Sequence, residues 1–230
     1  MSLDPVIQLR SVNKSYRGQR ALDDVTLEVP PGVVFALLGE NGAGKTSTIR
    51  ILLGLTPFDS GSGRILDLDS AQDGRKIRQS VGYVPERPAL DEWMKVDDVG
   101  WFAAGFYPPG YQQRYRDHIA AFGVPLDRKV KQLSKGMRAK VALSLAMSHE
   151  PKLLILDEPT SGLDAIVRRE FLESMVELTS DGKTVFLSSH QIHEVERVAD
   201  IVAILRHGKL LCCESLESLK SGTTEAVLTL

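Results

Sequence analysis

The segment at residues 39–46, GENGAGKT, has the residue types and spacing of a phosphate-binding loop. It fits the pattern G-x-x-x-x-G-K-S/T, follows an apolar run and precedes an expected helix. Glycines let successive backbone N–H groups face one phosphate chain at a helix N-terminus. Lys45 would reach the β- and γ-phosphates, and the Thr46 hydroxyl would bind Mg²⁺. We expect the contacting residues to be Gly39, Glu40, Asn41, Gly42, Ala43, Gly44, Lys45, Thr46 and Ser47.

Two carboxylates end the apolar run LLILDE at residues 153–158. Asp157 stands at the end of an expected buried strand, where it can hold Mg²⁺ directly or through water. Glu158 follows at the point where the chain turns, so both side chains can face the same site. Glu158 is then placed to act as general base for a water that attacks the γ-phosphate. The alternative is a structural acidic pair before the segment PTSGLD.

His190 and Tyr16 are two further candidates for the same site. His190 ends the segment TVFLSSH, and the carboxyl edge of a parallel sheet is where ligands bind. By itself a surface histidine is the simpler interpretation, but together with the loop and Glu158 it predicts a hydrogen bond to the γ-phosphate or the attacking water. Tyr16, in an expected turn, would stack on an adenine or simply pack against the protein. His193 is interpreted as structural.

The segment LSKGM at residues 133–137 resembles a second anion-binding site. Ser134 is an expected helix cap, followed by the cation Lys135 and by Gly136. Free backbone N–H groups and the helix dipole favour an anion at such a position. The chain thus has two candidate anion-binding sites, of which only the loop at 39–46 carries a complete phosphate-binding motif.

The elements that must position these residues alternate between strands and helices, which predicts a parallel sheet with right-handed crossovers. Residues 87–150 contain four prolines and expected helices, and this stretch is interpreted as a helical lobe inserted in an α/β core. Strands are expected at 6–12, 22–30, 32–39, 80–85, 152–158, 184–189 and 200–205, with a turn at 13–20. Helices are expected at 45–53, 94–106, 111–122, 167–178 and 192–198.

Composition narrows the class of protein. The 230 residues carry a net charge of -2, which offers no overall basic field for nucleic acid. No apolar run approaches the roughly 18 residues of a membrane span, and the N-terminus lacks the apolar stretch of a secretion signal. Cys212 and Cys213 are interpreted as buried thiols in a reducing compartment rather than as a redox pair. These features predict a cytosolic location.

The motifs taken in order resemble an ATP-binding cassette (ABC) ATPase over nearly all of the chain. They are Tyr16, GENGAGKT, GYVPE, LSKGM, LLILDEPT, SGLD and SSH. The resemblance implies an α/β fold: a P-loop NTPase (RecA-like) core at 1–86 and 151–230, an N-terminal antiparallel β subdomain, and a helical lobe at about 87–150. It implies a single nucleotide-binding domain with ATP and Mg²⁺ as cofactors.

The resemblance also suggests why there are two anion sites. Two ABC domains, alike or different, meet head to tail, and the LSGGQ segment of each closes on the ATP held by the other. Ser134, Lys135, Gly136 and Asp164 are then expected to contact ATP in trans. Lys135 and Met137 depart from the family's LSGGQ segment, and Glu86 stands where the family usually has a glutamine. Glu86 would still bind Mg²⁺, but it adds negative charge.

The pattern favours an ATPase subunit of an exporter, peripheral on the inner face of the plasma membrane through a separate integral membrane permease. A short helix of that permease would dock in a groove near Glu86. Trp93, Trp101 and Phe106 would line this groove; the alternative, which is more common for aromatic residues, is that they belong to the core. The alternatives are a soluble ABC ATPase acting on ribosomes or DNA, and a GTPase or small-molecule kinase, which would leave LSKGM and SGLD unexplained. EAVLTL, at residues 225–230, stops within an expected strand, and whether it is the native end is left open.

Overall fold

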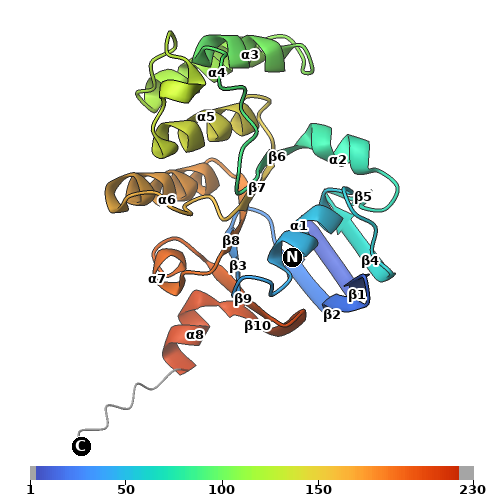
Figure 1. Cartoon of the computed structure of the whole chain (residues 1–230). Coiled ribbons are helices and arrows are strands. Elements are labelled where there is room, and N and C mark those ends of the chain that lie inside the picture. The colour runs from blue at the N-terminus through green and yellow to red at the C-terminus, as the bar shows by residue number, and fades with distance from the viewer. Residues whose placement is uncertain (1–3, 223–230) are drawn as a thin grey trace, which may run out of the picture.

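The computed structural model describes residues 4–222. Its centre is a sheet with helices on both sides, beside a second, smaller sheet (Figure 1). The strands are β1 (Ile7–Tyr16), β2 (Gln19–Val29), β3 (Val34–Leu38), β4 (Ser60–Ile65), β5 (Leu68–Asp69), β6 (Val81–Val84), β7 (Leu153–Asp157), β8 (Thr184–Ser189), β9 (Ile201–Arg206) and β10 (Lys209–Ser215). The helices are α1 (Lys45–Leu52), α2 (Gly74–Ser80), α3 (Val96–Ala104), α4 (Tyr111–Ala121), α5 (Lys135–Met147), α6 (Ala165–Ser180), α7 (Ile192–Val195) and α8 (Leu216–Gly222), with a 3-10 turn at Val130–Gln132.

The central sheet has the strand order β10-β9-β3-β8-β7-β6. All neighbours from β9 to β6 are parallel, and β10 runs antiparallel to β9 at one edge. Parallel neighbours require crossover connections, which the helices between the strands supply. The predicted α/β fold with a parallel sheet is therefore confirmed.

The apolar runs of the sequence form strands that are covered on both faces, as a parallel sheet requires. Every residue of β3, β7 and β8 is buried. Side chains alternate between two clusters: Phe35 and Phe186 stack at 5.3 Å on the face toward the smaller sheet and α1. Leu154 and Leu187 point to the other face, where they pack with α5, α6 and α7. The central strands therefore form a rigid base for the loops at their carboxyl ends.

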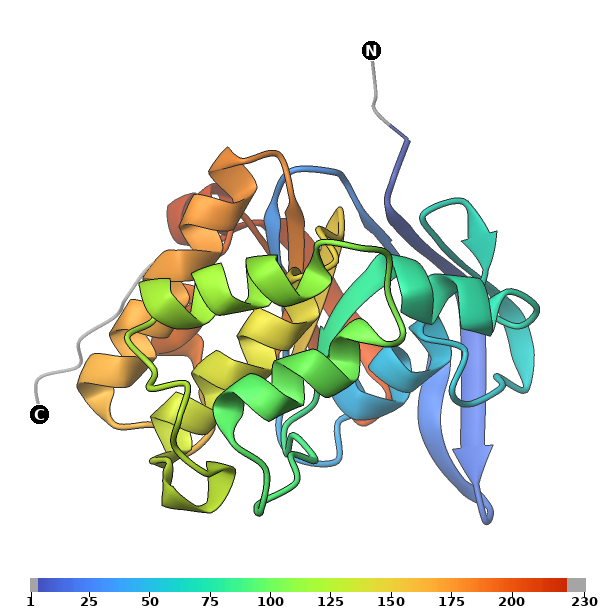
Figure 2. The ribbon, with the colours of Figure 1, turned by 90° about the horizontal axis from the view of Figure 1, so that it is seen from above.

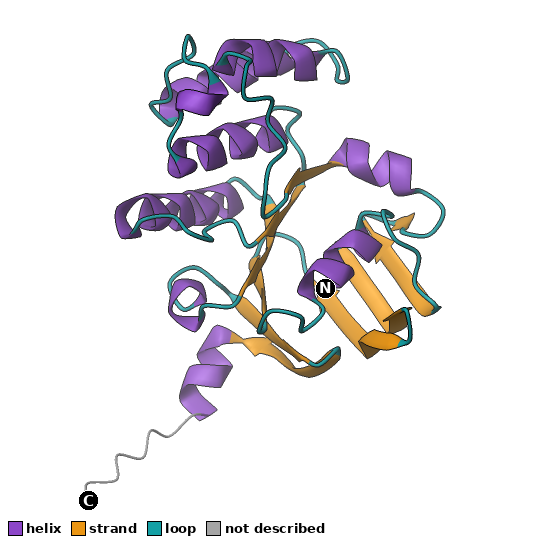
Figure 3. Cartoon of the chain, viewed as in Figure 1, coloured by secondary structure: helices purple, strands orange, loops and turns teal. Residues whose placement is uncertain are grey.

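The smaller sheet is antiparallel, with the order β2-β1-β4-β5 (Figure 3). Sequence analysis missed β4, β5, α2, β10 and α8. The β4 segment SGSGRI lacks apolar alternation, because four of its six residues are exposed. Its pairing with β1, which the sequence pattern does not reveal, defines it as a strand.

The helices α3, α4 and α5 group together at one end of the molecule (Figures 1 and 2). Tyr115 of α4 is fully buried in this group, and its hydroxyl donates to the Val96 carbonyl at 2.8 Å. The helices predicted at 94–106 and 111–122 are confirmed as α3 and α4. Helix α5 also packs on the central sheet through Leu143, so it links the helical group to the core.

Two predictions about local structure are wrong. The turn predicted at 13–20 is only two residues long, because β1 continues to Tyr16, which pairs with Gln19 of β2. Arg17 and Gly18 form that turn with φ of 50° and 84°, the positive values that a tight hairpin turn uses. The helix predicted at 192–198 is reduced to the four residues of α7.

The predictions for the aromatic residues and the cysteines also need correction. Trp93, Trp101 and Phe106 are 70%, 66% and 70% exposed, so the core interpretation is wrong for all three. Cys212 and Cys213 are free thiols, but Cys213 is exposed and Cys212 only half-buried. Both lie on β10, an edge strand that is not covered as the central strands are. The segment EAVLTL lies outside the described residues.

Candidate nucleotide-binding site

The predicted phosphate loop joins the carboxyl end of β3 to the N-terminus of α1. Gly44 is the N-cap of α1 with φ of 113°, and no side chain caps the helix. A side chain at Gly44 would lie 2.6 Å from the Ala21 carbonyl oxygen, so this position requires glycine. The first N–H groups of α1 therefore have no side-chain acceptor of their own, which leaves them suited to an anion.

Lys45, the first residue of α1, is only 5% exposed, and its side chain reaches back to the start of this loop. Its Nζ donates to the carbonyl oxygens of Gly39 at 2.5 Å and Glu40 at 3.2 Å. It also lies 3.0 Å from Glu158 Oε1, in an ion pair whose geometry falls outside that of a hydrogen bond. The ammonium is thus held where a phosphate chain on the loop would meet it.

Asp157 ends β7, and its carboxylate lies beside the hydroxyl of Thr46. Asp157 Oδ1 accepts hydrogen bonds from Ser188 Oγ at 2.7 Å and from Thr46 Oγ1 at 3.4 Å. Burial raises the pKa of Asp157; the hydrogen bonds from Ser188 and Thr46 oppose this rise, and the charges of Glu158 and Glu86 add to it. A cation at this position would offset both increases. The oxygen donors of Thr46 and Asp157 are of the type that Mg²⁺ prefers, so these residues fit a magnesium site.

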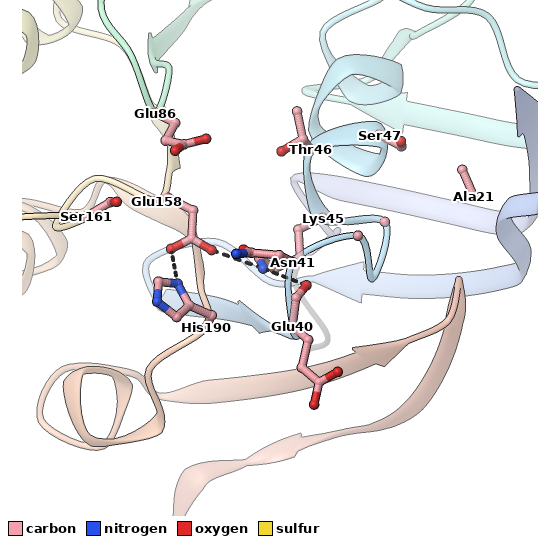
Figure 4. A pocket seen from close by; sticks show the side chains of 12 residues that line it. Ala21, Glu40, Asn41, Lys45, Thr46, Ser47, Glu86, Glu158, Ser161 and His190 are labelled. Carbon is pink, nitrogen blue, oxygen red and sulfur yellow. Dashed lines mark hydrogen bonds and ion pairs between the residues drawn. The ribbon is translucent and has the colours of Figure 1, made fainter.

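Glu158 and His190 approach each other from neighbouring strands β7 and β8. His190 Nδ1 lies 2.8 Å from Glu158 Oε2, and only 10% of the glutamate side chain is exposed. Glu158 has φ of 48°, an unusual conformation for a residue with a side chain, and its N–H donates to Ser188 Oγ at 2.9 Å. This backbone conformation turns Glu158 toward the phosphate loop, and both Lys45 and His190 point at its carboxylate (Figure 4).

One pocket brings most of the predicted site residues together (Figure 4). Sequence analysis missed two of its lining residues: Ala21, which lies in a segment without a nucleotide-binding pattern, and Ser161, the first residue of the SGLD motif, from which only Asp164 was predicted. The predicted residues Gly39, Ala43 and Asp157 do not line this pocket. Tyr16 does not line it; the tyrosine is 40% exposed, with Lys14 Nζ 5.3 Å from its ring centre. The lining residues are Ala21, Glu40, Asn41, Gly42, Gly44, Lys45, Thr46, Ser47, Glu86, Glu158, Ser161 and His190.

The second predicted anion site does not line this pocket. Ser134 caps α5 by accepting a hydrogen bond from the Met137 N–H at 3.2 Å, as predicted. Gly136 is buried, and a side chain there would lie 2.6 Å from Val167 Cγ1. Lys135 Nζ lies against Gly162 in the loop before α6. Asp164, the N-cap of α6, is exposed. Lys135 lines a second pocket, which shares Glu86 and Ser161 with the first.

The fold and the pocket define a class of protein: a phosphate-loop nucleotide-binding domain, with two carboxylates and a histidine at the carboxyl edge of its sheet. The family model for ABC transporters matches residues 22–161. The chain belongs to the ABC transporter ATP-binding family, and its fold is that of an ABC ATPase cassette.

Relatives of this chain agree with that assignment. An uncharacterized ABC transporter ATP-binding protein of Nostoc sp. is 39% identical over 86% of this chain, which spans 61% of that protein. The Nod factor export ATP-binding protein I of Cupriavidus metallidurans is 36% identical over 89% of this chain and 69% of its own. The chain thus spans less than two thirds of the Nostoc relative.

A solved structure of the ATP-binding subunit of an ABC transporter superposes with a TM-score of 0.83 at 31% identity, covering 94% of this chain and 92% of the other. Among the helices of residues 4–222, none is both long and apolar enough to cross a membrane.

Proposed function

We propose that this chain is the ATP-binding and hydrolysing subunit of an ABC transporter. The observation that carries the proposal is the convergence of Lys45, Glu158 and His190 on one pocket at the phosphate loop. A phosphate loop alone serves many enzymes. A carboxylate held between the loop lysine and a histidine adds the general base that hydrolysis of the γ-phosphate requires.

The proposed reaction uses these three residues in order. The triphosphate binds the N–H groups of the loop and takes over the Lys45 ammonium from Glu158. The released Glu158 carboxylate accepts a proton from a water molecule, whose oxygen attacks the γ-phosphorus. The bond between this phosphorus and the β,γ-bridging oxygen breaks, and ADP and inorganic phosphate result. His190 keeps the Glu158 carboxylate oriented through the 2.8 Å contact.

We assign Mg²⁺ to the oxygens of Thr46 and Asp157, with Glu86 as a third ligand. The ion would neutralise charge on the β- and γ-phosphates. Glu86 lines the same pocket and acts on the Asp157 pKa, which supports its place near the ion. A carboxylate here, rather than the family's usual glutamine, adds one negative charge next to the γ-phosphate.

We further propose that two such domains pair, alike or different, and that Ser134, Lys135, Gly136 and Asp164 contact the ATP of the partner domain. None of these four residues lines the pocket that holds Lys45, which supports a contact with the ATP of a second chain rather than with the ATP on the loop of the same chain. Ser134→Arg tests this assignment. It should leave ATP binding to the single domain intact and prevent ATP-dependent dimers in light scattering; dimers that persist would contradict it.

The partner in the membrane is proposed to be an integral membrane permease, with this chain bound to its cytoplasmic side at the inner face of the plasma membrane. Trp93, Trp101 and Phe106 supply an exposed aromatic surface on the helical group. Exposed apolar patches of this kind mark docking sites. The Nod factor export relative favours an exporter. Nucleic acid is not expected as a partner, because the net charge is -2.

One experiment tests the proposal as a whole. The tagged chain is purified from solubilised membranes of its own cells, co-purifying proteins are identified, and ATP hydrolysis is measured. A multi-spanning membrane protein together with MgATP hydrolysis is the expected result. Ribosomal proteins or DNA-associated factors would refute the transporter assignment and leave the ATPase assignment standing.

A further inference from the structure

Glu194 is a buried carboxylate that the proposed reaction does not use. It belongs to the short helix α7 and is only 2% exposed. Its Oε2 accepts hydrogen bonds from Thr160 Oγ1 at 2.6 Å and from Ser189 Oγ at 3.2 Å. Its Oε1 forms an ion pair with Arg168 Nε at 3.0 Å. Burying a carboxylate costs free energy unless it is paired, and the three partners of Glu194 offset this cost and fix its position.

Two of these partners are next to the proposed catalytic pair. Thr160 lies two residues after Glu158, and Ser189 directly precedes His190. These contacts form a closed ring. The chain leads from Glu158 to Thr160, and Glu194 links Thr160 to Ser189 by hydrogen bonds. Ser189 is followed by His190, which contacts Glu158. Because Glu194 bonds to both segments, it limits how far Glu158 and His190 can separate.

The ring of contacts can stabilise the strained backbone conformation of Glu158. A residue with a side chain at positive φ is strained and persists only when its surroundings hold it. The hydrogen bond from the Glu158 N–H to Ser188 supports the residue on one side. The bond between Thr160 and Glu194 holds the chain on the other side, where it would otherwise relax away from the pocket.

Arg168 extends the network to the loop at 160–164. It lies in the first turn of α6, where its N–H donates to the Asp164 carbonyl at 2.9 Å. Its Nη2 also donates to the Leu163 carbonyl at 3.0 Å. A movement of this loop would therefore pull on Glu194 through Arg168. Asp164, the residue proposed to contact the partner domain, lies at the end of the same loop.

We propose that Glu194 is a positioning residue that holds Glu158 and His190 at their reactive separation and couples that pair to the seating of loop 160–164. The proposal rests on the hydrolytic function proposed above. It assigns Glu194 no contact with ATP, and it predicts that the loop facing a partner domain controls turnover rather than nucleotide affinity.

The test compares Glu194→Ala, Glu194→Gln and Thr160→Val in the whole chain by kcat for MgATP and by the Kd of a fluorescent ATP analogue. Glu194→Ala should lower kcat about ten- to a hundredfold, because a misplacement of about 1 Å has that effect. The Kd should change less than about twofold, since Lys45 and its loop are untouched. Glu194→Gln should recover most of kcat, because its amide oxygen still accepts from Thr160 and Ser189.

Two further comparisons separate positioning from a general loss of stability. Thr160→Val removes the same hydrogen bond from the other side, so the double variant with Glu194→Ala should be no worse than Glu194→Ala alone. Glu196→Ala is the matched control, because this exposed glutamate lies two residues away at the end of the same helix. It should leave both kcat and Kd unchanged.

Each other outcome overturns the idea. An unchanged kcat in Glu194→Ala, fully additive effects with Thr160→Val, or a kcat loss matched by a Kd loss would remove Glu194 as a positioning residue. If Glu194→Ala does not fold, Thr160→Val decides: it should lower kcat without a change in Kd, while Glu194→Gln keeps most of kcat, and any other combination overturns the idea. A wild-type chain that binds the analogue but never hydrolyses MgATP would instead refute the proposed hydrolysis, and the inference with it.

Discussion

Exchanging Glu158 for glutamine is expected to tighten ATP binding while it removes hydrolysis. Lys45 Nζ lies 3.0 Å from Glu158 Oε1, and the two side chains are only 6% and 10% exposed. A triphosphate on the loop must compete with this carboxylate for the ammonium. Glutamine keeps the size of the side chain but not its charge. It therefore no longer competes with the triphosphate for the Lys45 ammonium, and it cannot accept a proton as a general base.

The magnitude follows from that distance. Two unit charges 3.0 Å apart attract by about 5 kcal/mol at an effective dielectric constant of about 20. Much of this attraction is offset, because the pair is desolvated and Lys45 keeps its hydrogen bonds to Gly39 and Glu40. A net effect of about 1–2 kcal/mol remains, which is about a five- to thirtyfold decrease in Kd. Loss of the base should lower kcat by about 10²–10⁴-fold.

The assay is isothermal calorimetry with MgATP on Glu158→Gln, combined with phosphate release at saturating ATP. Glu196→Gln is the matched control, because it removes one negative charge from an exposed side chain that does not line the pocket. Its Kd should change less than about twofold. Weaker binding by Glu158→Gln would refute the competition, and an unchanged kcat would remove Glu158 as the base.

Three further variants test other parts of the structure. Lys45→Ala should weaken MgATP binding at least about tenfold, because a hydrogen bond to a charged group contributes about 1.5–3 kcal/mol; unaltered affinity in calorimetry would exclude the phosphate contact. Burial raises the pKa of Asp157 above 3.8, so the native state holds this proton more tightly than the unfolded state, and stability falls as pH rises through that window. Asp157→Asn should therefore raise Tm at about pH 7, flatten this pH dependence and weaken magnesium-dependent binding; a Tm profile parallel to wild type would contradict the sign. Gly100→Ala would overlap the Tyr115 ring and should destabilise the chain by about 1–3 kcal/mol in denaturant unfolding, whereas Gly105→Ala, with its nearest neighbour at 3.4 Å, should be nearly neutral.

Most of the nucleotide pocket could be predicted from the sequence because its chemistry is local. The loop at 39–46 carries its glycines, its lysine and its threonine in one continuous stretch, so their spacing alone predicts the phosphate site. Asp157, Glu158 and His190 were predictable because they stand at the ends of expected strands, and the ends of parallel strands meet at one edge of the sheet.

Other features were not predictable, because they depend on which elements become neighbours. Trp93 and Phe106 are of residue types that usually lie in the core, and only the packing of the helical group leaves them exposed. Strand β4 has no apolar pattern and exists through its pairing with β1. Cys213 follows an apolar segment, but the strand that carries it lies at the edge of the sheet and is exposed.

The sequence by itself determined the class of fold, the phosphate loop and the identity of the carboxylates and histidine, because each is encoded in a short segment. Tertiary structure alone decided how they act on one another. It paired Lys45 with Glu158, and it brought Thr160, Arg168 and Ser189 around Glu194 from separate elements. The physical reason is that ion pairs and buried polar networks depend on distances of about 3 Å between segments, which local sequence patterns do not specify.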